Sequence, residues 1–179
     1  MISLRRLRRS DFSYVKALAF KGLSANPLHG FDFDEFTIAK IFDRFYRTRD
    51  AFFVGLEEDG RLVGWFSAVP GHGVMHSETK AMSQVYYQCE LEGFKGIAAL
   101  RQVHESFFNY TEAKKYELAI TSSILSSQKV FNRILVRDGW TPSTGELLVK
   151  PTRFHLSLRQ QRGESVGGGG VASPEIRAD

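Results

Sequence analysis

A glycine loop that follows a strand-like run is the part of this sequence best suited to binding a charged ligand. Gln84–Leu91 reads as a strand, and Glu92–Gly96 leads directly into a helix. Such a loop presents unpaired backbone N–H groups and the positive end of the helix dipole, which together suit a pyrophosphate. The pattern therefore indicates a phosphate-binding loop. The alternative is that Gly93 and Gly96 only permit a tight turn.

Polar side chains at the ends of two predicted strands are the candidate catalytic groups. Glu90 and Glu92 could serve as a general base for an amine, directly or through water, and a solvated strand edge is the alternative. Ser122 and Ser123 close the next strand and could hold a water or a leaving group, or could cap the following turn. Cys89, the only cysteine, is interpreted as a small core side chain rather than an acyl-carrying nucleophile, because no histidine near it in sequence would activate it.

The elements around these residues predict a mixed α/β domain with one sheet. Asp59-Gly60 is a hairpin signal, Ser10-Asp11 caps a first helix, and the Pro70–Gly73 run is expected to break a strand before a polar loop at Val74–Lys80. Two strand–helix units in the second half predict a parallel pair of strands that diverge at their carboxyl ends. The predicted strands are Ile2–Leu7, Ala51–Leu56, Arg61–Val69, Ala81–Leu91, Tyr116–Ile124 and Gly145–Lys150, and the later helices are Asp34–Arg47, Gly96 to Lys115 and Ser127–Asp138.

Length and composition limit the classes of protein. The chain has 179 residues, a formal net charge of +4 and a pI of about 9.3, which suits one soluble domain and is too mildly basic for a dedicated nucleic-acid binder. One cysteine excludes a disulfide framework, and no set of metal ligands can be assembled. No apolar run reaches the roughly 18 residues of a membrane span, and the N-terminal arginines precede no apolar signal segment. A cytoplasmic protein is expected, with residues 1–155 as the domain and the Gly-rich 156–179 as a flexible tail.

This order of elements resembles the Gcn5-related N-acetyltransferase superfamily over roughly Ile2 to Lys150. The family's loop pattern Arg/Gln-x-x-Gly-x-Gly/Ala is matched by Gly93-Phe94-Lys95-Gly96-Ile97-Ala98, with Gly93 in place of Arg or Gln. The later helix of the family often ends in Gly-Phe, which Gly139-Trp140 matches. Leu135 occupies the place of the tyrosine that often protonates the departing coenzyme A thiolate.

The resemblance implies that acetyl-coenzyme A lies between the two parallel strands as a co-substrate. Its pantetheine arm would contact the backbone of Gln88, Cys89 and Leu91, and its pyrophosphate would meet the N–H groups from Phe94 to Ala98 with Lys95 nearby. The expected cofactor-binding residues are therefore Gln88, Cys89, Leu91, Phe94, Lys95, Gly96, Ile97 and Ala98. The loop that holds His72 and His76 would approach the acceptor, although a plain loop histidine is the default.

Two functions from different classes stay open. The first is an N-acetyltransferase that moves an acetyl group to a primary amine of a small molecule or protein, with Glu90 and Ser122 as the catalytic candidates. The second is an inactive binding or structural protein that kept the fold, which Leu135 and Gly93 favour. A homodimer is left open, and no membrane or nucleic-acid partner is expected; for Arg5–Arg9, nucleic-acid contact is the alternative to a solvated edge.

Overall fold

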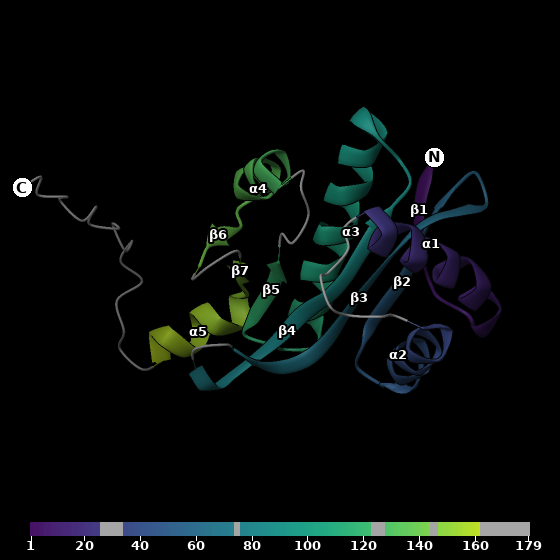
Figure 1. Ribbon diagram of the computed structural model, residues 1–179. Helices are drawn as coiled ribbons and strands as arrows, with labels where there is room; N and C mark the ends of the chain where they lie inside the picture. The colour runs from purple at the N-terminus through teal and green to yellow at the C-terminus, as the bar shows by residue number, and fades with distance from the viewer. Residues whose placement is uncertain (26–33, 74–75, 123–127, 144–146, 162–179) are drawn as a thin grey trace, which may run out of the picture.

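The computed structural model shows a seven-stranded mixed sheet with helices on both faces (Figure 1). It describes residues 1–25, 34–73, 76–122, 128–143 and 147–161. The strand order is β1-β2-β3-β4-β5-β7-β6, and β4 and β5 are the parallel pair in this sheet of described strands. The strands are β1 Ile2–Arg6, β2 Phe52–Glu58, β3 Arg61–Gly73, β4 His76–Cys89, β5 Leu118–Ser122, β6 Thr141–Pro142 and β7 Leu147–Pro151. The helices are α1 Phe12–Ala25, α2 Glu35–Arg47, α3 Gly93–Ala113, α4 Gln128–Arg137 and α5 Arg153–Gln161, with a 3-10 turn η1 at Arg9–Asp11.

Local signals in the sequence form the turns and caps that they predict. Asp59 and Gly60 join β2 to β3 with φ angles of 51° and 82°, the left-handed pair that a two-residue hairpin turn requires. Asp34 caps α2, where its carboxylate accepts a hydrogen bond of 2.6 Å from the Thr37 N–H. The mixed α/β class predicted from the sequence is confirmed.

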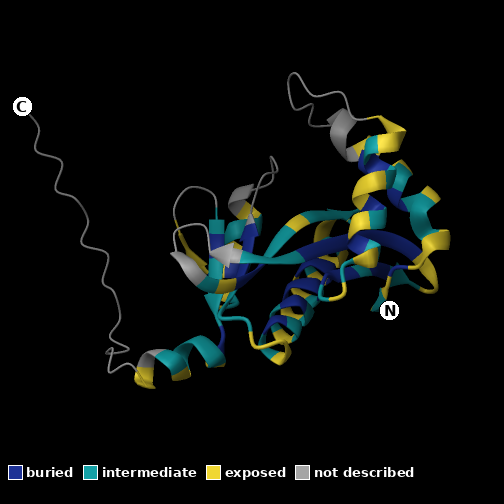
Figure 2. Ribbon diagram, turned by 90° about the horizontal axis from the view of Figure 1, so that it is seen from below, coloured by how far each residue is buried: buried dark blue, intermediate teal, exposed yellow. Residues whose placement is uncertain are grey.

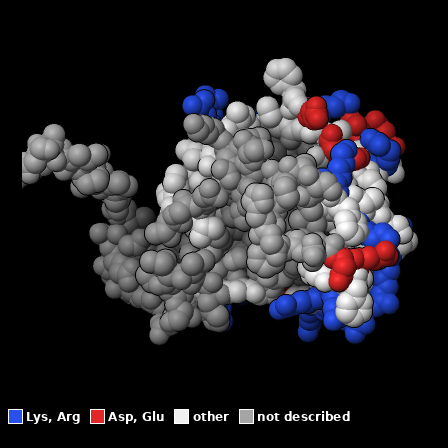
Figure 3. Space-filling model, viewed as in Figure 1, with Lys and Arg blue, Asp and Glu red and all other residues white. Residues whose placement is uncertain are grey.

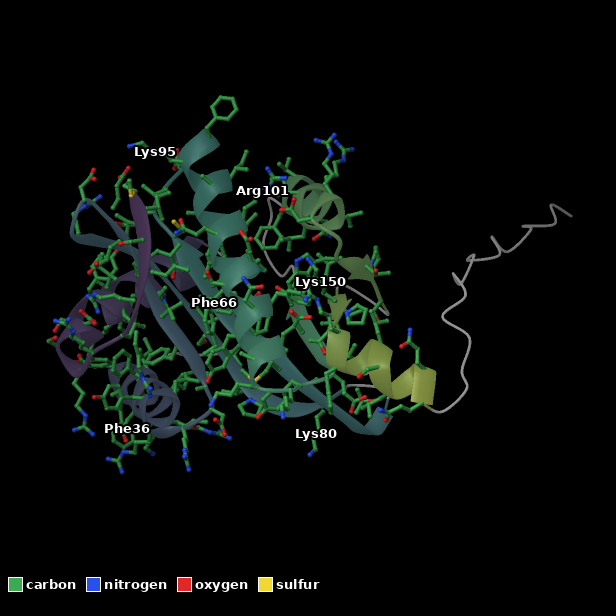
Figure 4. The ribbon with its side chains drawn as sticks, turned by 180° about the vertical axis from the view of Figure 1, so that it is seen from behind. Phe36, Phe66, Lys80, Lys95, Arg101 and Lys150 are labelled. Atoms are coloured by element: carbon green, nitrogen blue, oxygen red, sulfur yellow. The ribbon has the colours of Figure 1, made fainter. Side chains whose placement is uncertain are left out.

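The sheet separates two hydrophobic cores. Helices α1 and α2 cover one face and α3 covers the opposite face, as the views from the front and from behind show (Figures 1 and 4). Buried residues concentrate in the central strands and on the side of α3 that faces the sheet (Figure 2). The core under α1 and α2 includes Leu7, Val15, Leu18, Phe42, Phe45, Phe53 and Trp65. The core under α3 and α4 includes Leu56, Phe66, Met82, Val103, Phe107, Leu135 and Trp140.

Strands β3 and β4 are longer than the sequence predicts. Pro70 was expected to break β3, but β3 continues to Gly73, and Pro70 lies opposite Met82 of β4. Beyond Ala68, the last residue that pairs with β2, β3 has a strand neighbour on one side only, and a proline is tolerated in such an edge position. The predicted loop at Val74–Lys80 was therefore wrong from His76 onward, because β4 begins there.

A helix that the sequence analysis did not predict follows the last strand. Helix α5 begins after Thr152, whose backbone carbonyl accepts from the Leu156 N–H at 3.2 Å and whose side-chain oxygen lies 3.4 Å from the His155 N–H. Thr152 thus acts as the N-cap directly after Pro151 ends β7. The predicted tail from residue 156 begins as helix up to Gln161. Residues 162–179 lie outside the described residues, so their flexibility stays a prediction.

Candidate active site

The parallel strands β4 and β5 pair over only three residues and then part. Their pairs are Ala81↔Leu118, Met82↔Ala119 and Ser83↔Ile120. Strand β4 continues to Cys89 with β3 as its partner, while β5 continues to Ser122 with β7 as its partner. From Gln84 onward the edge of β4 that faces β5 therefore has no strand partner among the described residues. The predicted parallel neighbours are confirmed, and the change of partners marks where they separate.

A β-bulge at Val85 determines which side chains of β4 face each core. Tyr86 lies opposite Ser67 and Gln84 lies opposite Ala68, so Val85 is the extra residue. An extra residue reverses the alternation of side chains along a strand. Met82 lies in the core under α3, and after the bulge Tyr87 and Cys89 pack against that same core. Tyr86 instead packs in the core under α1 and α2.

A buried polar cluster lies directly beyond the last parallel pair. The Thr121 hydroxyl of β5 donates to the Gln84 side-chain oxygen of β4. His104 of α3 places Nε2 3.2 Å from Thr121 Oγ1 and 3.3 Å from Gln84 Oε1. Its Nδ1 lies 2.9 Å from the Leu100 carbonyl, which can only accept, so Nδ1 carries the proton and Nε2 is the acceptor.

Burial keeps His104 neutral. The ring is 1% exposed, and burial lowers the pKa of His104 to about 4. His104 is not among the candidate residues predicted from the sequence. The available signal was its position on the apolar stripe of α3 between Leu100 and Phe107, where a polar side chain needs partners from the sheet.

The loop from β4 into α3 offers three free N–H groups. Helix α3 begins at Gly93, and the Gly96 N–H donates to the Glu92 carbonyl at 3.1 Å as the first helical bond. The N–H groups of Gly93, Phe94 and Lys95 therefore have no helical partner, and the Glu92 side chain does not cap them. The family resemblance predicts donors from Phe94 to Ala98. The free donors instead lie one position earlier and end at Lys95, because the N–H groups from Gly96 onward, including those of Ile97 and Ala98, bond within the helix.

Glycine is required at one position of this loop for lack of space. A Cβ on Gly96 would lie 2.5 Å from the Leu91 carbonyl oxygen, closer than real atoms approach. Gly93 meets no atom but has a φ of 55°, which favours glycine. The Lys95 ammonium lies 2.6 Å from Glu58 Oε1, and this hydrogen bond raises the pKa of Lys95. Lys95 lies at the top of α3 in Figure 4, and Phe94 beside it is 93% exposed.

The candidate base Glu90 lies on the other face of the sheet from Tyr87 and Cys89. Its Oε2 accepts from the Tyr14 hydroxyl at 3.1 Å, and its Oε1 lies 3.5 Å from the Lys21 ammonium. Burial, with a smaller contribution from the hydrogen bond to Glu90, raises the pKa of Tyr14. Glu90 is therefore a paired carboxylate under α1 rather than a solvated strand edge.

Three buried polar atoms on the same face of the sheet as Glu90 have no partner among the described residues. They are Trp65 Nε1, Ser67 Oγ and Gln88 Oε1. Trp65 and Gln88 are cross-strand neighbours on β3 and β4, and Ser67 lies opposite Tyr86 on the same two strands. Unsatisfied buried polar atoms are uncommon and often mark a place that a ligand or water completes.

Several candidates are not brought into this site. Ser122 ends β5 opposite Leu147, but its side chain lies outside the described residues, as do those of Ser123, His72 and His76. Within the described residues no three His, Cys, Asp or Glu side chains gather as a metal site. None of the described helices is long and apolar enough to cross a membrane.

Several charged side chains away from the loop are paired with one another. Lys and Arg side chains gather over α2, with acidic side chains among them (Figure 3). Asp43 pairs with both Arg9, at 3.6 Å, and Arg47, at 2.7 Å. A cavity of about 440 Å³ between α3 and β7 contains Arg101 and Lys150, both labelled in Figure 4, and each of these cations hydrogen-bonds Asp138.

The chain is similar to known proteins in its three-dimensional structure, whereas its sequence matches none of the families or curated proteins compared. An N-acetyltransferase from Staphylococcus aureus superimposes with a TM-score of 0.65 at 13% identity, over 84% of this chain and 98% of that chain. A predicted acetyltransferase from Clostridium acetobutylicum with acetyl-CoA gives 0.62 at 11% identity, over 80% and 92%. Spermidine N-acetyltransferase from Vibrio cholerae, in complex with CoA and spermine, gives 0.61 at 9% identity, over 87% and 98%. The chain therefore has the fold of the Gcn5-related N-acetyltransferases.

Proposed function

We propose that the chain binds acetyl-CoA along the free edge of β4 and transfers the acetyl group to a primary amine. The main observation behind this proposal is that an unpaired strand edge runs directly into the N-terminal end of a helix. Within the described part of the chain, the edge of β4 has no strand partner from Gln84 onward, and it leads into the N–H groups of Gly93, Phe94 and Lys95, which have no helical partner. A pyrophosphate suits the helix end, and an extended arm with amide groups suits a free strand edge.

The length of the ligand fits this path. The pantetheine arm between the pyrophosphate and the sulfur contains two amides and is about as long as four extended residues, roughly 13 Å. Four residues back from Leu91 along β4 is Tyr87. With the phosphates on the first turn of α3, the thioester therefore lies between Tyr87 and the buried cluster at Gln84, where β4 and β5 part.

The chemistry is direct attack by the amine and not transfer through the protein. Burial raises the pKa of the Cys89 thiol and is the largest of the influences on it. A protonated thiol without a base is a poor nucleophile. The acceptor approaches from the α1 and α2 face, where Glu90 removes a proton from the amine directly or through a water, and where Trp65, Ser67 and Gln88 offer unpartnered polar atoms.

One observation favours the alternative of an inactive binding protein. Leu135, at the position where the family often has a tyrosine, is fully buried in the core under α3 and α4. Helix α4 therefore supplies no proton donor to the sulfur at this position. Under both alternatives the chain would bind acetyl-CoA at the same site. Only the active protein, which we place in a reducing cytoplasm, would transfer the acetyl group to an amine.

The test uses Phe94, which is exposed and whose N–H is one of the three free donors. Phe94→Glu places a carboxylate where the pyrophosphate should bind, yet it leaves the fold intact because an acidic residue suits the first turn of a helix. Phe94→Gln is the matched neutral control. Calorimetric titration with acetyl-CoA should show binding by the wild type and by Phe94→Gln, and a loss of at least about tenfold in Phe94→Glu.

Two outcomes would contradict parts of the proposal. Equal affinity in both variants would place the phosphates elsewhere. Tight binding without acetyl transfer to any member of a panel of primary amines, such as spermidine and lysine-containing peptides, would favour the inactive protein.

A further inference from the structure

Tyr87 is the polar side chain that β4 directs toward α4 at the depth expected for the thioester. Its ring packs between Phe66 of β3, His104 of α3 and Phe131 of α4, with centroid distances of 6.2, 5.9 and 6.2 Å. These three neighbours come from three different elements, so the ring is fixed on several sides. Among the described residues the hydroxyl makes no hydrogen bond that meets the usual distance and angle limits, and the Cys89 thiol is the nearby group that acts on its pKa, so the hydroxyl is available to an acceptor on a ligand.

Several other described groups around this gap are not available as donors. Phe131 and Leu135 of α4 are apolar. The His104 ring gives its proton to the Leu100 carbonyl and turns an acceptor nitrogen toward β4 and β5. The Thr121 hydroxyl already donates to Gln84. The donors that remain among the described residues named here are the phenol of Tyr87, which makes no hydrogen bond among them, and the side-chain amide of Gln84, which lies deeper, where the strands begin to part.

The chemistry of thioester aminolysis needs such a donor. As the amine nitrogen bonds to the acetyl carbon, the carbon–sulfur bond breaks and its electron pair stays on sulfur, while the proton of the amine leaves to the base or to water. The departing thiolate is stabilised by a hydrogen bond that forms as the charge develops, and it takes up a proton from solvent on release.

We infer that the Tyr87 hydroxyl donates a hydrogen bond to the sulfur of coenzyme A and stabilises the departing thiolate. This assignment rests on the proposed function, because it needs the arm of the cofactor on the free edge of β4. It accounts for Leu135, since the phenol comes from β4 and α4 need not supply one. Burial raises the pKa of Tyr87, so the phenol keeps its proton at neutral pH and serves as a donor.

The bulge at Val85 is what makes this assignment specific. Without the extra residue, Tyr86 rather than Tyr87 would face α4. Tyr86 instead stacks on Trp65 at 4.6 Å on the other face of the sheet. The two adjacent tyrosines therefore provide a matched pair in which only one hydroxyl reaches the sulfur.

The experiment compares coenzyme A with desulfo-coenzyme A, which lacks the sulfur, in the wild type, Tyr87→Phe and Tyr86→Phe. Dissociation constants are measured by calorimetry at about pH 7 and about pH 9.5, where a thiol with a pKa near 8.5 is largely ionised. At the higher pH, Tyr87→Phe should weaken coenzyme A by about tenfold or more and desulfo-coenzyme A by less than about twofold, because hydrogen bonds to charged groups are the strong ones. At neutral pH, where the thiol is mostly protonated, Tyr87→Phe should weaken coenzyme A by a smaller factor relative to desulfo-coenzyme A. Tyr86→Phe should leave the ratio of the two ligands unchanged.

The outcomes separate this inference from the proposed function. Equal losses for both ligands in Tyr87→Phe, or no loss for either, would overturn the role of Tyr87 while leaving the cofactor site intact. Wild-type protein that binds neither ligand would overturn the proposed function, and the inference with it. Thermal unfolding of the variants checks folding, and Tyr87→Phe keeps the ring that packs against Phe131.

Discussion

The side chains of Gln84 and Thr121 hydrogen-bond across β4 and β5 at the first position beyond the last pair of the two strands. His104 of α3, the helix that covers this face of the sheet, places its Nε2 beside both side chains. The cluster therefore connects three elements at the point where the sheet opens. Buried polar groups are costly unless they are satisfied, and the bond between Thr121 and Gln84 satisfies one donor and one acceptor across the two strands, so it helps to fix where the separation begins.

Thr121→Val tests this cluster. The change keeps the shape of the side chain but leaves the Gln84 side-chain oxygen without its hydroxyl donor, so we expect a loss of about 1–3 kcal/mol in the free energy of unfolding. Thr111→Val is the control, because Thr111 is equally buried but donates only to the Phe107 carbonyl within its own helix. Urea unfolding measures both. A loss in Thr121→Val no larger than in the control would mean that the cluster does not hold the strands.

His104 should make stability depend on pH. Its pKa is about 4 in the folded protein, against an ordinary value of 6.5, so below about pH 6.5 the unfolded chain takes up a proton that the folded chain refuses. Stability is therefore lost as the pH falls from about 6.5 to about 4, by up to about 3 kcal/mol. His104→Gln should flatten this part of the profile in urea unfolding at a series of pH values. An unchanged slope would show that other groups dominate.

The sequence predicts those features that depend on neighbouring residues. Asp59-Gly60 and Asp34 act within a few residues, so the hairpin and the cap of α2 follow directly from them. The bulge at Val85 depends on how β4 meets β3, and no local signal in the sequence reveals it. The partners of His104 come from β4 and β5, so they appear only once the chain is folded.

Gly96→Ala should destabilise the protein and abolish cofactor binding. The new methyl group would press on the Leu91 carbonyl, so the loop must move. We expect a loss of about 2 kcal/mol or more in unfolding free energy, the range of severe steric substitutions. Gly71→Ala is the control, because a Cβ there meets no atom within 4 Å, and it should change stability by less than about 0.5 kcal/mol. Wild-type stability in Gly96→Ala would mean that the loop adapts without cost.

The Cys89 thiol should react slowly with alkylating reagents, and bound acetyl-CoA should slow the reaction further. Burial raises the pKa of Cys89, so little thiolate is present at neutral pH and alkylation by iodoacetamide should be slower than that of a free thiol. Saturating acetyl-CoA should slow it further if the arm lies on this edge of β4. Mass spectrometry follows the modification, and Cys89→Ala should bind acetyl-CoA with an affinity within about threefold of the wild type. A stable acetyl group on Cys89 during turnover would show an acyl-enzyme route instead of direct attack.

Two truncations test where the domain ends. A chain that stops after Gln161 keeps α5 and loses only 162–179, which carries four consecutive glycines and almost no large apolar residue, so its melting temperature should stay within a few degrees of the full chain. A chain that stops after Pro151 also loses Thr152, which is buried and donates its hydroxyl to the Tyr116 carbonyl at 2.6 Å, while its N–H donates to the Glu117 carbonyl at 2.9 Å. Because these bonds fix the entry to β5, we expect the second truncation to melt roughly 5 °C or more below the first. Equal melting temperatures would show that α5 and its cap are not part of the domain, whereas a large drop in the first truncation would show that 162–179 packs on it.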